Sequence, residues 1–176
     1  MWKKWMGIRI CAGALVGLAV FYIRYFRLPV CITPVLCCSG VSVFLTLAGM
    51  AGLLLPGCYI VLGLGWLALV VGMIAPGRRR REKPKALEWT VPLLFLVALC
   101  AYAAVRVNEK SFIHYDNYSH WGLMVSQMLR LDALPTAVSA PVVAFSSYPP
   151  AAACLVYFFA RFSGASEGAM MFGQAF

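Results

Sequence analysis

Residues 114–121, His-Tyr-Asp-Asn-Tyr-Ser-His-Trp, form a polar and ionisable patch in a chain that is otherwise strongly apolar. The patch contains both histidines of the protein, and three of the six acidic residues, Glu109, Asp116 and Asp132, lie in it or near it. A carboxylate or imidazole beside a bilayer costs several kcal/mol unless it is solvated or paired. This concentration of ionisable groups therefore predicts a functional site.

Asp116 is the strongest candidate for chemistry in this patch. A carboxylate here could act as the general base for an acceptor hydroxyl, or could hold a divalent metal that offsets phosphate charge. An aspartate just before a helix can equally be an N-cap, which requires no chemistry. The residue types alone leave both interpretations open.

The neighbouring imidazoles and cations extend this candidate site. His114, Asp116 and His120 could together bind a metal, or the histidines could simply lie on a wet interfacial loop. Arg106 and Arg130 could bind a lipid phosphate, or could be rim charges that snorkel to the interface. A divalent metal is the one cofactor that these residue types suggest, with Asp116 as its ligand.

The composition is that of an integral membrane protein. The chain is 62% hydrophobic and 12% charged, whereas soluble domains are about 45–50% apolar and about 25% charged. The mean hydropathy is +0.83. Because lipid offers the backbone no hydrogen bonds, each long apolar run is expected to be helical. The predicted fold class is all-α, a polytopic transmembrane helix bundle with an extracytoplasmic amphipathic surface helix.

Apolar runs divide the chain into three predicted parts. Residues 1–77 contain three transmembrane helices, residues 78–88 form a basic cytoplasmic loop, and residues 89–176 contain a further helix, a polar loop, another helix and a truncated one. The apolar runs cover about residues 8–26, 30–55, 58–75, 89–107 and 148–162, and the last begins near residue 167. Most approach the roughly 20 residues that cross the hydrocarbon core. The short last run indicates the N-terminal part of a longer protein.

Small local motifs add detail to these helices. Gly13 and Gly17 form a GxxxG motif, which permits close contact with another helix. Pro56-Gly57 is expected to form the tight turn between the second and third runs. All seven cysteines lie in apolar runs, which favours a packing role over disulfides or zinc binding.

The distribution of positive charge predicts the orientation. The formal net charge is +9, and its largest part is the cluster Arg-Arg-Arg-Arg-Glu-Lys-Pro-Lys at residues 78–85. The positive-inside rule places this cluster in the cytoplasm, where it could also contact anionic headgroups. The loop at residues 108–147 is then extracytoplasmic, and the fifth run returns inward with Arg161 at its inner end. We expect the bacterial plasma membrane as the location.

A second element is predicted inside the polar loop. Apolar residues recur at helical spacing within residues 117–131, whereas polar residues fall on the opposite side. The apolar positions are Trp121, Met124, Val125, Met128 and Leu131. This pattern predicts an amphipathic helix along the membrane surface, ended by Leu134-Pro135.

The order of motifs in residues 90–170 resembles the first outer loop of the GT-C membrane glycosyltransferases. Asp116-Asn117-Tyr118-Ser119-His120-Trp121 is followed by Met128-Leu129, by Leu134-Pro135, and by Phe145-Ser146-Ser147-Tyr148-Pro149-Pro150 and Tyr157. The chain is most similar to the lipid A aminoarabinose transferase and protein O-mannosyltransferase group. In that group an acidic residue follows the first core helix, and a surface helix and a Pro-Pro segment come next.

The resemblance implies a function and assigns residues to it. Asp116 matches the acidic catalytic position of the family. Tyr148, a candidate substrate-binding residue, stands where the aminoarabinose transferases carry a lysine, and Asn117 replaces a second acidic residue seen in some members. The implied activity is transfer of a sugar from a polyprenyl-phosphate donor to an acceptor on the extracytoplasmic side. The expected partners are this donor and membrane lipids, with no nucleic acid.

A non-enzymatic membrane protein is the alternative. In a transporter or assembly subunit the outer loop would act as a binding lid. A transporter is expected to carry ionisable groups or broken helices at mid-membrane. The apolar runs here have nearly charge-free interiors, which favours chemistry at the membrane surface.

Overall fold

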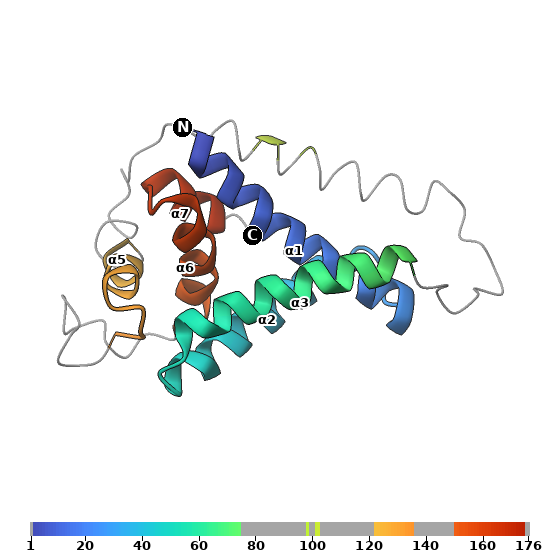
Figure 1. The fold of residues 1–176 in the computed structure, drawn as a ribbon, viewed down its shortest axis with the longest axis horizontal. Helices are drawn as coiled ribbons and strands as arrows, with labels where there is room; N and C mark the ends of the chain where they lie inside the picture. The colour runs from blue at the N-terminus through green and yellow to red at the C-terminus, as the bar shows by residue number, and fades with distance from the viewer. Residues whose placement is uncertain (1, 75–97, 99–100, 103–121, 136–149, 175–176) are drawn as a thin grey trace.

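The computed structural model describes residues 2–74, 98, 101–102, 122–135 and 150–174, with side chains described from Trp5 onward. Every regular element in this part of the chain is a helix (Figure 1), as the composition predicts. The principal helices are α1 (Trp2–Phe26), α2 (Thr33–Met50), α3 (Leu54–Ile74), α5 (Gly122–Leu131), α6 (Ala151–Ser163) and α7 (Glu167–Gln174). The predicted fourth apolar run, residues 89–107, lies almost wholly outside the described residues.

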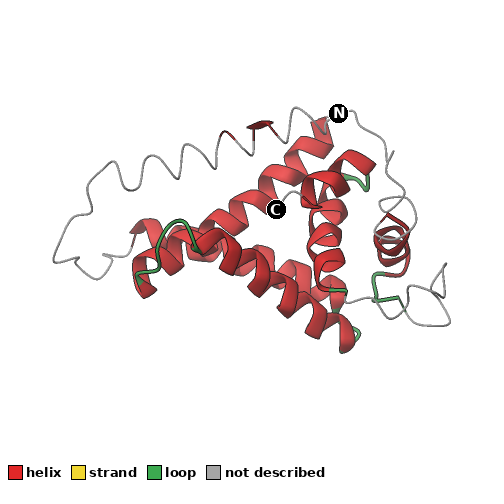
Figure 2. Ribbon diagram, turned by 180° about the vertical axis from the view of Figure 1, so that it is seen from behind, coloured by secondary structure: helices red, strands yellow, loops and turns green. Residues whose placement is uncertain are grey.

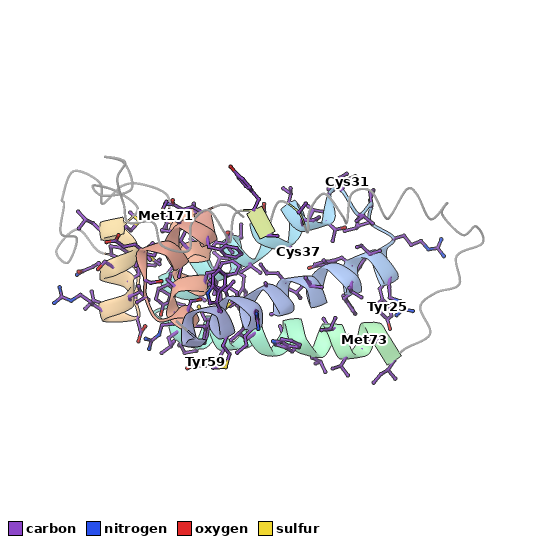
Figure 3. All side chains as sticks on the ribbon, turned by 90° about the horizontal axis from the view of Figure 1, so that it is seen from above. Tyr25, Cys31, Cys37, Tyr59, Met73 and Met171 are labelled. Carbon is purple, nitrogen blue, oxygen red and sulfur yellow. The ribbon has the colours of Figure 1, made fainter. Side chains whose placement is uncertain are left out.

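The helices α1, α2 and α3 are long and apolar enough to cross a membrane. Only about a third of each span is buried inside the protein, 33%, 28% and 33% respectively. The rest presents large apolar side chains outward, such as Leu47, Leu67 and Met73, which are 61%, 58% and 66% exposed. Met73 lies at the outer edge of the helices in Figure 3. These surfaces suit contact with lipid tails, which are as apolar as the side chains themselves.

Glycines bring α1 and α3 into close backbone contact. Gly17 of the GxxxG motif lies directly against the carbonyl group of Gly65, and the indole of Trp66 covers Gly13. Further along, Gly72 faces Val20, so the two helices run in the same direction. Helices in lipid associate through close packing because no water is released. The motif therefore serves the most extensive helix contact in the described part of the chain.

The connection between α2 and α3 differs from the prediction. Helix α2 ends at Met50, and the turn consists of residues 51–53, where Gly52 has a φ of +73°. Pro56 and Gly57 lie in the first turn of α3 instead. A proline fits this position because the first amides of a helix have no intrahelical partner. Gly57 faces Ala48 of α2, so its role is close packing, and the predicted Pro-Gly turn is wrong.

Helix α6 lies across the open end of a V formed by α1 and α3 (Figure 2). Its C-terminal end is close to the N-terminal ends of both helices, since the carbonyl of Phe162 approaches Gly7 and the ring of Phe162 contacts Tyr59, with centroids 5.5 Å apart. Its N-terminal end is beside α2, where the Thr46 hydroxyl donates to the sulfur of Cys154 at 3.7 Å. The helix thus closes one end of the three-helix group.

The environment of α6 is unlike that of the three long helices. Every residue from Ala153 to Ala160 is buried, as expected for a helix that is apolar on all sides and surrounded by protein. Its 13 residues span about 20 Å at 1.5 Å per residue, too short to cross the hydrocarbon core of about 30 Å. The expected fifth run is helical, but its described helix is not of spanning length.

A tight connection joins α6 to α7. Gly164 adopts a left-handed conformation with a φ of +86°, and its amide donates to the carbonyl of Ala160, which closes the helix. Ser166 then accepts a hydrogen bond from the amide of Ala169 at 3.3 Å and caps α7. The two helices pack through the rings of Phe159 and Phe172, whose centroids are 5.7 Å apart.

Candidate functional site

The amphipathic helix of the polar loop is α5, and its apolar side faces protein. Val125 and Met128 are fully buried, and α5 packs against α6 and α7, on the outer side of α6 (Figure 1). Both residues belong to the predicted apolar face. Leu131, the last predicted member, is 49% exposed, so the buried stripe is narrower than predicted.

Helix α5 ends at Leu131, the predicted end, three residues before Leu134-Pro135. The next residue, Asp132, has a φ of +50°, and its amide still donates to the carbonyl of Met128 at 2.8 Å. Aspartate tolerates this left-handed conformation better than most residues, so it can terminate a helix. The chain then turns toward α2, where the side chain of Leu134 fills the space over Gly49.

The carboxylate of Asp132 is held by two side chains of α6. The hydroxyl of Tyr157 donates to Oδ1 at 2.6 Å, and Nη2 of Arg161 donates to Oδ2 at 3.0 Å. Tyr157 and Arg161 are four residues apart, so they lie on the same face of α6. We call Asp132, Tyr157 and Arg161 the Asp132 cluster.

The Asp132 cluster lies at the boundary between buried and exposed structure. Tyr157 is fully buried, whereas the side chains of Arg161 and Asp132 are 35% and 30% exposed. Hydrogen bonds to a charged acceptor are worth more than neutral ones, about 1.5–3 kcal/mol, while a partly exposed ion pair contributes about 0–1 kcal/mol. The bond from Tyr157 is therefore the stronger link between α5 and α6.

The geometry of the cluster favours positioning over proton transfer. Both oxygens of Asp132 accept hydrogen bonds from α6, which fixes the orientation of the carboxylate. A general base must instead reach the proton that it removes. The arrangement holds the end of α5 in place.

The ion pair corrects one step of the orientation argument. Arg161 was expected at the inner end of a helix that returns across the membrane, opposite the loop that contains Asp132. The two side chains are 3.0 Å apart, so they lie on the same side of the molecule. Arg161 therefore does not support the predicted inward return of α6.

Most sequence-predicted site residues lie outside the described part of the chain. These are Arg106, His114, Asp116, His120 and Tyr148. Arg130 is described, and it is exposed in the last turn of α5, on the side opposite Val125. A basic residue there interacts favourably with the carbonyl end of the helix dipole.

Most of the described cysteines are buried between helices, as a packing role requires. Five of the six are buried and one, Cys31, is exposed, and all six are free thiols. The thiol of Cys11 on α1 lies 3.7 Å from the carbonyl oxygen of Phe158 on α6, an example of a small side chain at a helix contact. Among the described residues, no group of three His, Cys, Asp or Glu side chains could hold a metal ion.

Sequence reasoning noted the members of the Asp132 cluster without joining them. In the sequence, Asp132 lies in the polar loop and Tyr157 belongs to the motifs that resemble the transferases. Arg161 lies near the end of the fifth apolar run. Tyr157 and Arg161 are polar groups at i and i+4 in an otherwise apolar run, a pattern that indicates a shared partner. Asp132 directly follows the predicted amphipathic helix, and its carboxylate is a suitable partner for both groups. No family model, curated protein or solved structure matches the chain.

Proposed function

We propose that this chain is the N-terminal part of a GT-C-like glycosyltransferase. The enzyme would transfer a sugar from a polyprenyl-phosphate donor to an acceptor on the extracytoplasmic side of the membrane. The observation that carries the proposal is the ordered set of motifs from Asp116 to Tyr157, with a carboxylate just before the predicted surface helix and a Pro-Pro segment before the next helix. Asp116 is the proposed catalytic residue.

The described architecture supports the proposal in one respect. A loop that performs chemistry needs a rigid element to position it, and α5 supplies one because Val125 and Met128 anchor it in the protein core. The Asp132 cluster fixes the far end of the same helix to α6. Arg130 remains exposed on α5, where a guanidinium can meet an anionic group.

The chemistry that the proposal requires matches the residue types in the loop. Removing the proton of an acceptor hydroxyl requires a base, the role that we assign to Asp116. The leaving group is a lipid phosphate, whose developing charge is stabilised by cations. Arg106 and Arg130 are the proposed cations, and His114, His120 and Tyr148 are proposed to line the substrate. A divalent metal, if used, would be held by Asp116.

The parallel arrangement of α1 and α3 supports the proposed orientation. Their C-terminal ends lie at the same end of the group, because Val20 and Gly72 are in contact and the guanidinium of Arg24 donates to the carbonyl of Gly72. Arg27 and the basic cluster at residues 78–85 follow these ends in the sequence. The proposal places this basic end in the cytoplasm of a bacterial plasma membrane and the residue 108–147 loop outside.

The test compares two Asp→Asn variants of the full-length protein. Asp116→Asn keeps the size and helix-capping ability of the side chain but removes its charge, so transfer should fall by about a hundredfold or more. Asp132→Asn is the matched control, since Asn tolerates a left-handed conformation. Its amide oxygen can still accept the hydrogen bond from Tyr157, so α5 stays in place and activity should be retained. Transfer is measured in membranes from polyprenyl-phosphate mannose and polyprenyl-phosphate aminoarabinose, with protein levels determined in parallel.

Each outcome of this comparison has a distinct meaning. Wild-type transfer by Asp116→Asn would reduce Asp116 to a helix cap and remove the catalytic assignment. Absence of transfer by the wild-type protein from both donors would count against the transferase and favour the non-enzymatic alternative.

A further inference from the structure

A pocket of about 280 Å³ lies on the outer side of the contact between α1 and α3. Its lining consists of Trp5, Met6, Arg9 and Ile10 from α1 and Trp66 from α3. Four of the five side chains are apolar or aromatic, and one is a guanidinium. Trp66 covers Gly13, which lies about 6 Å further along α1 than Arg9. An apolar wall therefore extends from the guanidinium toward the middle of the span.

The position of Arg9 calls for an anionic partner. It belongs to the candidate membrane span Trp5–Phe26, yet within the described part of the chain it forms no ion pair, and the salt bridge found there joins Arg161 to Asp132. A guanidinium at the edge of the hydrocarbon either snorkels to the interface or pairs with an anion. Trp5 lies one helical turn nearer the N-terminal end of α1, and tryptophan is typical of the headgroup region.

We propose that this pocket binds an anionic phospholipid. The phosphate would pair with the guanidinium of Arg9, which suits a bidentate contact with phosphate oxygens. One acyl chain would run inward from Arg9 along Ile10 and Trp66. Arg9 is the one charged residue in the lining of the pocket, and its positive charge favours an anionic lipid over a zwitterionic one.

The apolar wall argues against a soluble anion as the occupant. Met6, Ile10 and Trp66 are 46%, 37% and 41% exposed in the protein alone, and the spans around them are expected to lie in lipid. A free phosphate would leave that surface without a partner, whereas an acyl chain covers it. This inference does not depend on the proposed glycosyl transfer.

The experiment measures lipid preference with brominated lipids, which quench nearby tryptophan fluorescence. The full chain carries Trp2→Phe, Trp89→Phe and Trp121→Phe, so that Trp5 and Trp66 are its two remaining tryptophans. It is reconstituted in phosphatidylcholine vesicles that contain a small fraction of brominated phosphatidylglycerol or brominated phosphatidylcholine. Trp5 and Trp66 in the pocket should be quenched more efficiently by the anionic lipid. The expected preference is about fivefold, the ratio that corresponds to one basic side chain near an anionic headgroup.

Variants assign the preference to the pocket. Arg9→Gln should lower the preference to about onefold, and Arg9→Lys should restore part of it because the charge returns without the bidentate geometry. Arg27→Gln is the matched control, since Arg27 is an exposed arginine beyond the opposite end of α1, and it should leave the preference unchanged. Circular dichroism verifies that each variant retains its helical content.

Two results would overturn the inference. Equal quenching of the wild-type protein by the two brominated lipids would mean that the pocket does not select anionic lipid. An undiminished preference in Arg9→Gln, with helical content intact, would place the selective site elsewhere on the protein.

Discussion

The contact between α1 and α3 predicts a large difference between two glycines that are neighbours on α3. A Cβ atom added at Gly65 would come within 2.5 Å of the carbonyl oxygen and 2.7 Å of the Cα of Ala14, both in the backbone of α1. A Cβ atom added at Gly63 would meet nothing within 4 Å. Gly65→Ala should therefore weaken the packing of the helices, and Gly63→Ala should not.

The magnitude follows from the geometry. Contacts between carbon atoms are optimal at about 3.5–4.0 Å, so α1 must move away from α3 by about 1 Å to admit the new Cβ atom. A gap of that size removes up to about half of the dispersion energy of each neighbouring contact between the two helices. Overpacking of this kind costs about 1–3 kcal/mol. Both substitutions gain the same helix propensity, about 1 kcal/mol for Gly to Ala. The difference between the two variants thus isolates the clash, and Gly65→Ala should be about 1–3 kcal/mol less stable than Gly63→Ala.

The assay is reversible unfolding in dodecylmaltoside micelles with rising fractions of sodium dodecyl sulfate, followed by far-ultraviolet circular dichroism. The fluorescence of Trp66 provides a second probe, because its indole covers Gly13 of the neighbouring helix. Equal unfolding free energies for Gly65→Ala and Gly63→Ala would refute the close approach of α1 and α3, and with it the role of the GxxxG motif.

Three further predictions concern the Asp132 cluster and the orientation. Tyr157→Phe should lower the unfolding free energy by about 1.5–3 kcal/mol, because it removes a hydrogen bond to a charged acceptor; a loss below about 0.5 kcal/mol would contradict the bond to Asp132. Arg161→Leu should cost less than about 1 kcal/mol in the same assay, because its ion pair is partly exposed, and a larger loss would mean that the pair is effectively buried. In a background without the native cysteines, Ser139→Cys should react with an impermeant maleimide in intact cells and Lys83→Cys should not; the reverse pattern would invert the proposed topology.

Composition and periodicity predicted the elements better than their arrangement. The expected helices at residues 8–26, 30–55 and 58–75 correspond to α1, α2 and α3, because a lipid environment leaves helix as the one way to satisfy the backbone. The connection at Pro56-Gly57 was wrong because proline both breaks a helix interior and fits a helix start. A Pro-Gly dipeptide is therefore compatible with a turn and with a helix start. The contact between Gly57 and Ala48 of α2 distinguishes the two, and such a tertiary contact cannot be read from the local sequence.

The candidate site was predictable only in part. Periodicity identified Val125 and Met128 as the buried face of α5, since apolar residues three apart share a side of a helix. The pairing of Asp132 with Tyr157 and Arg161 joins residues 25 and 29 positions apart, and no local pattern encodes a contact across that separation. The roles assigned to Asp116 and its neighbours remain predictions.

The crosswise position of α6 has a consequence for biosynthesis. The ribosome completes α1, α2 and α3 before it reaches residue 151, and the intervening residues require on the order of 4–15 s at about 5–20 residues per second. During that interval Gly7 and Cys11 of α1 lack the contacts that they later make with α6. Helix α6 therefore reaches the three-helix group after that group has been synthesised, which makes the docking of α6 a separate and late step in assembly.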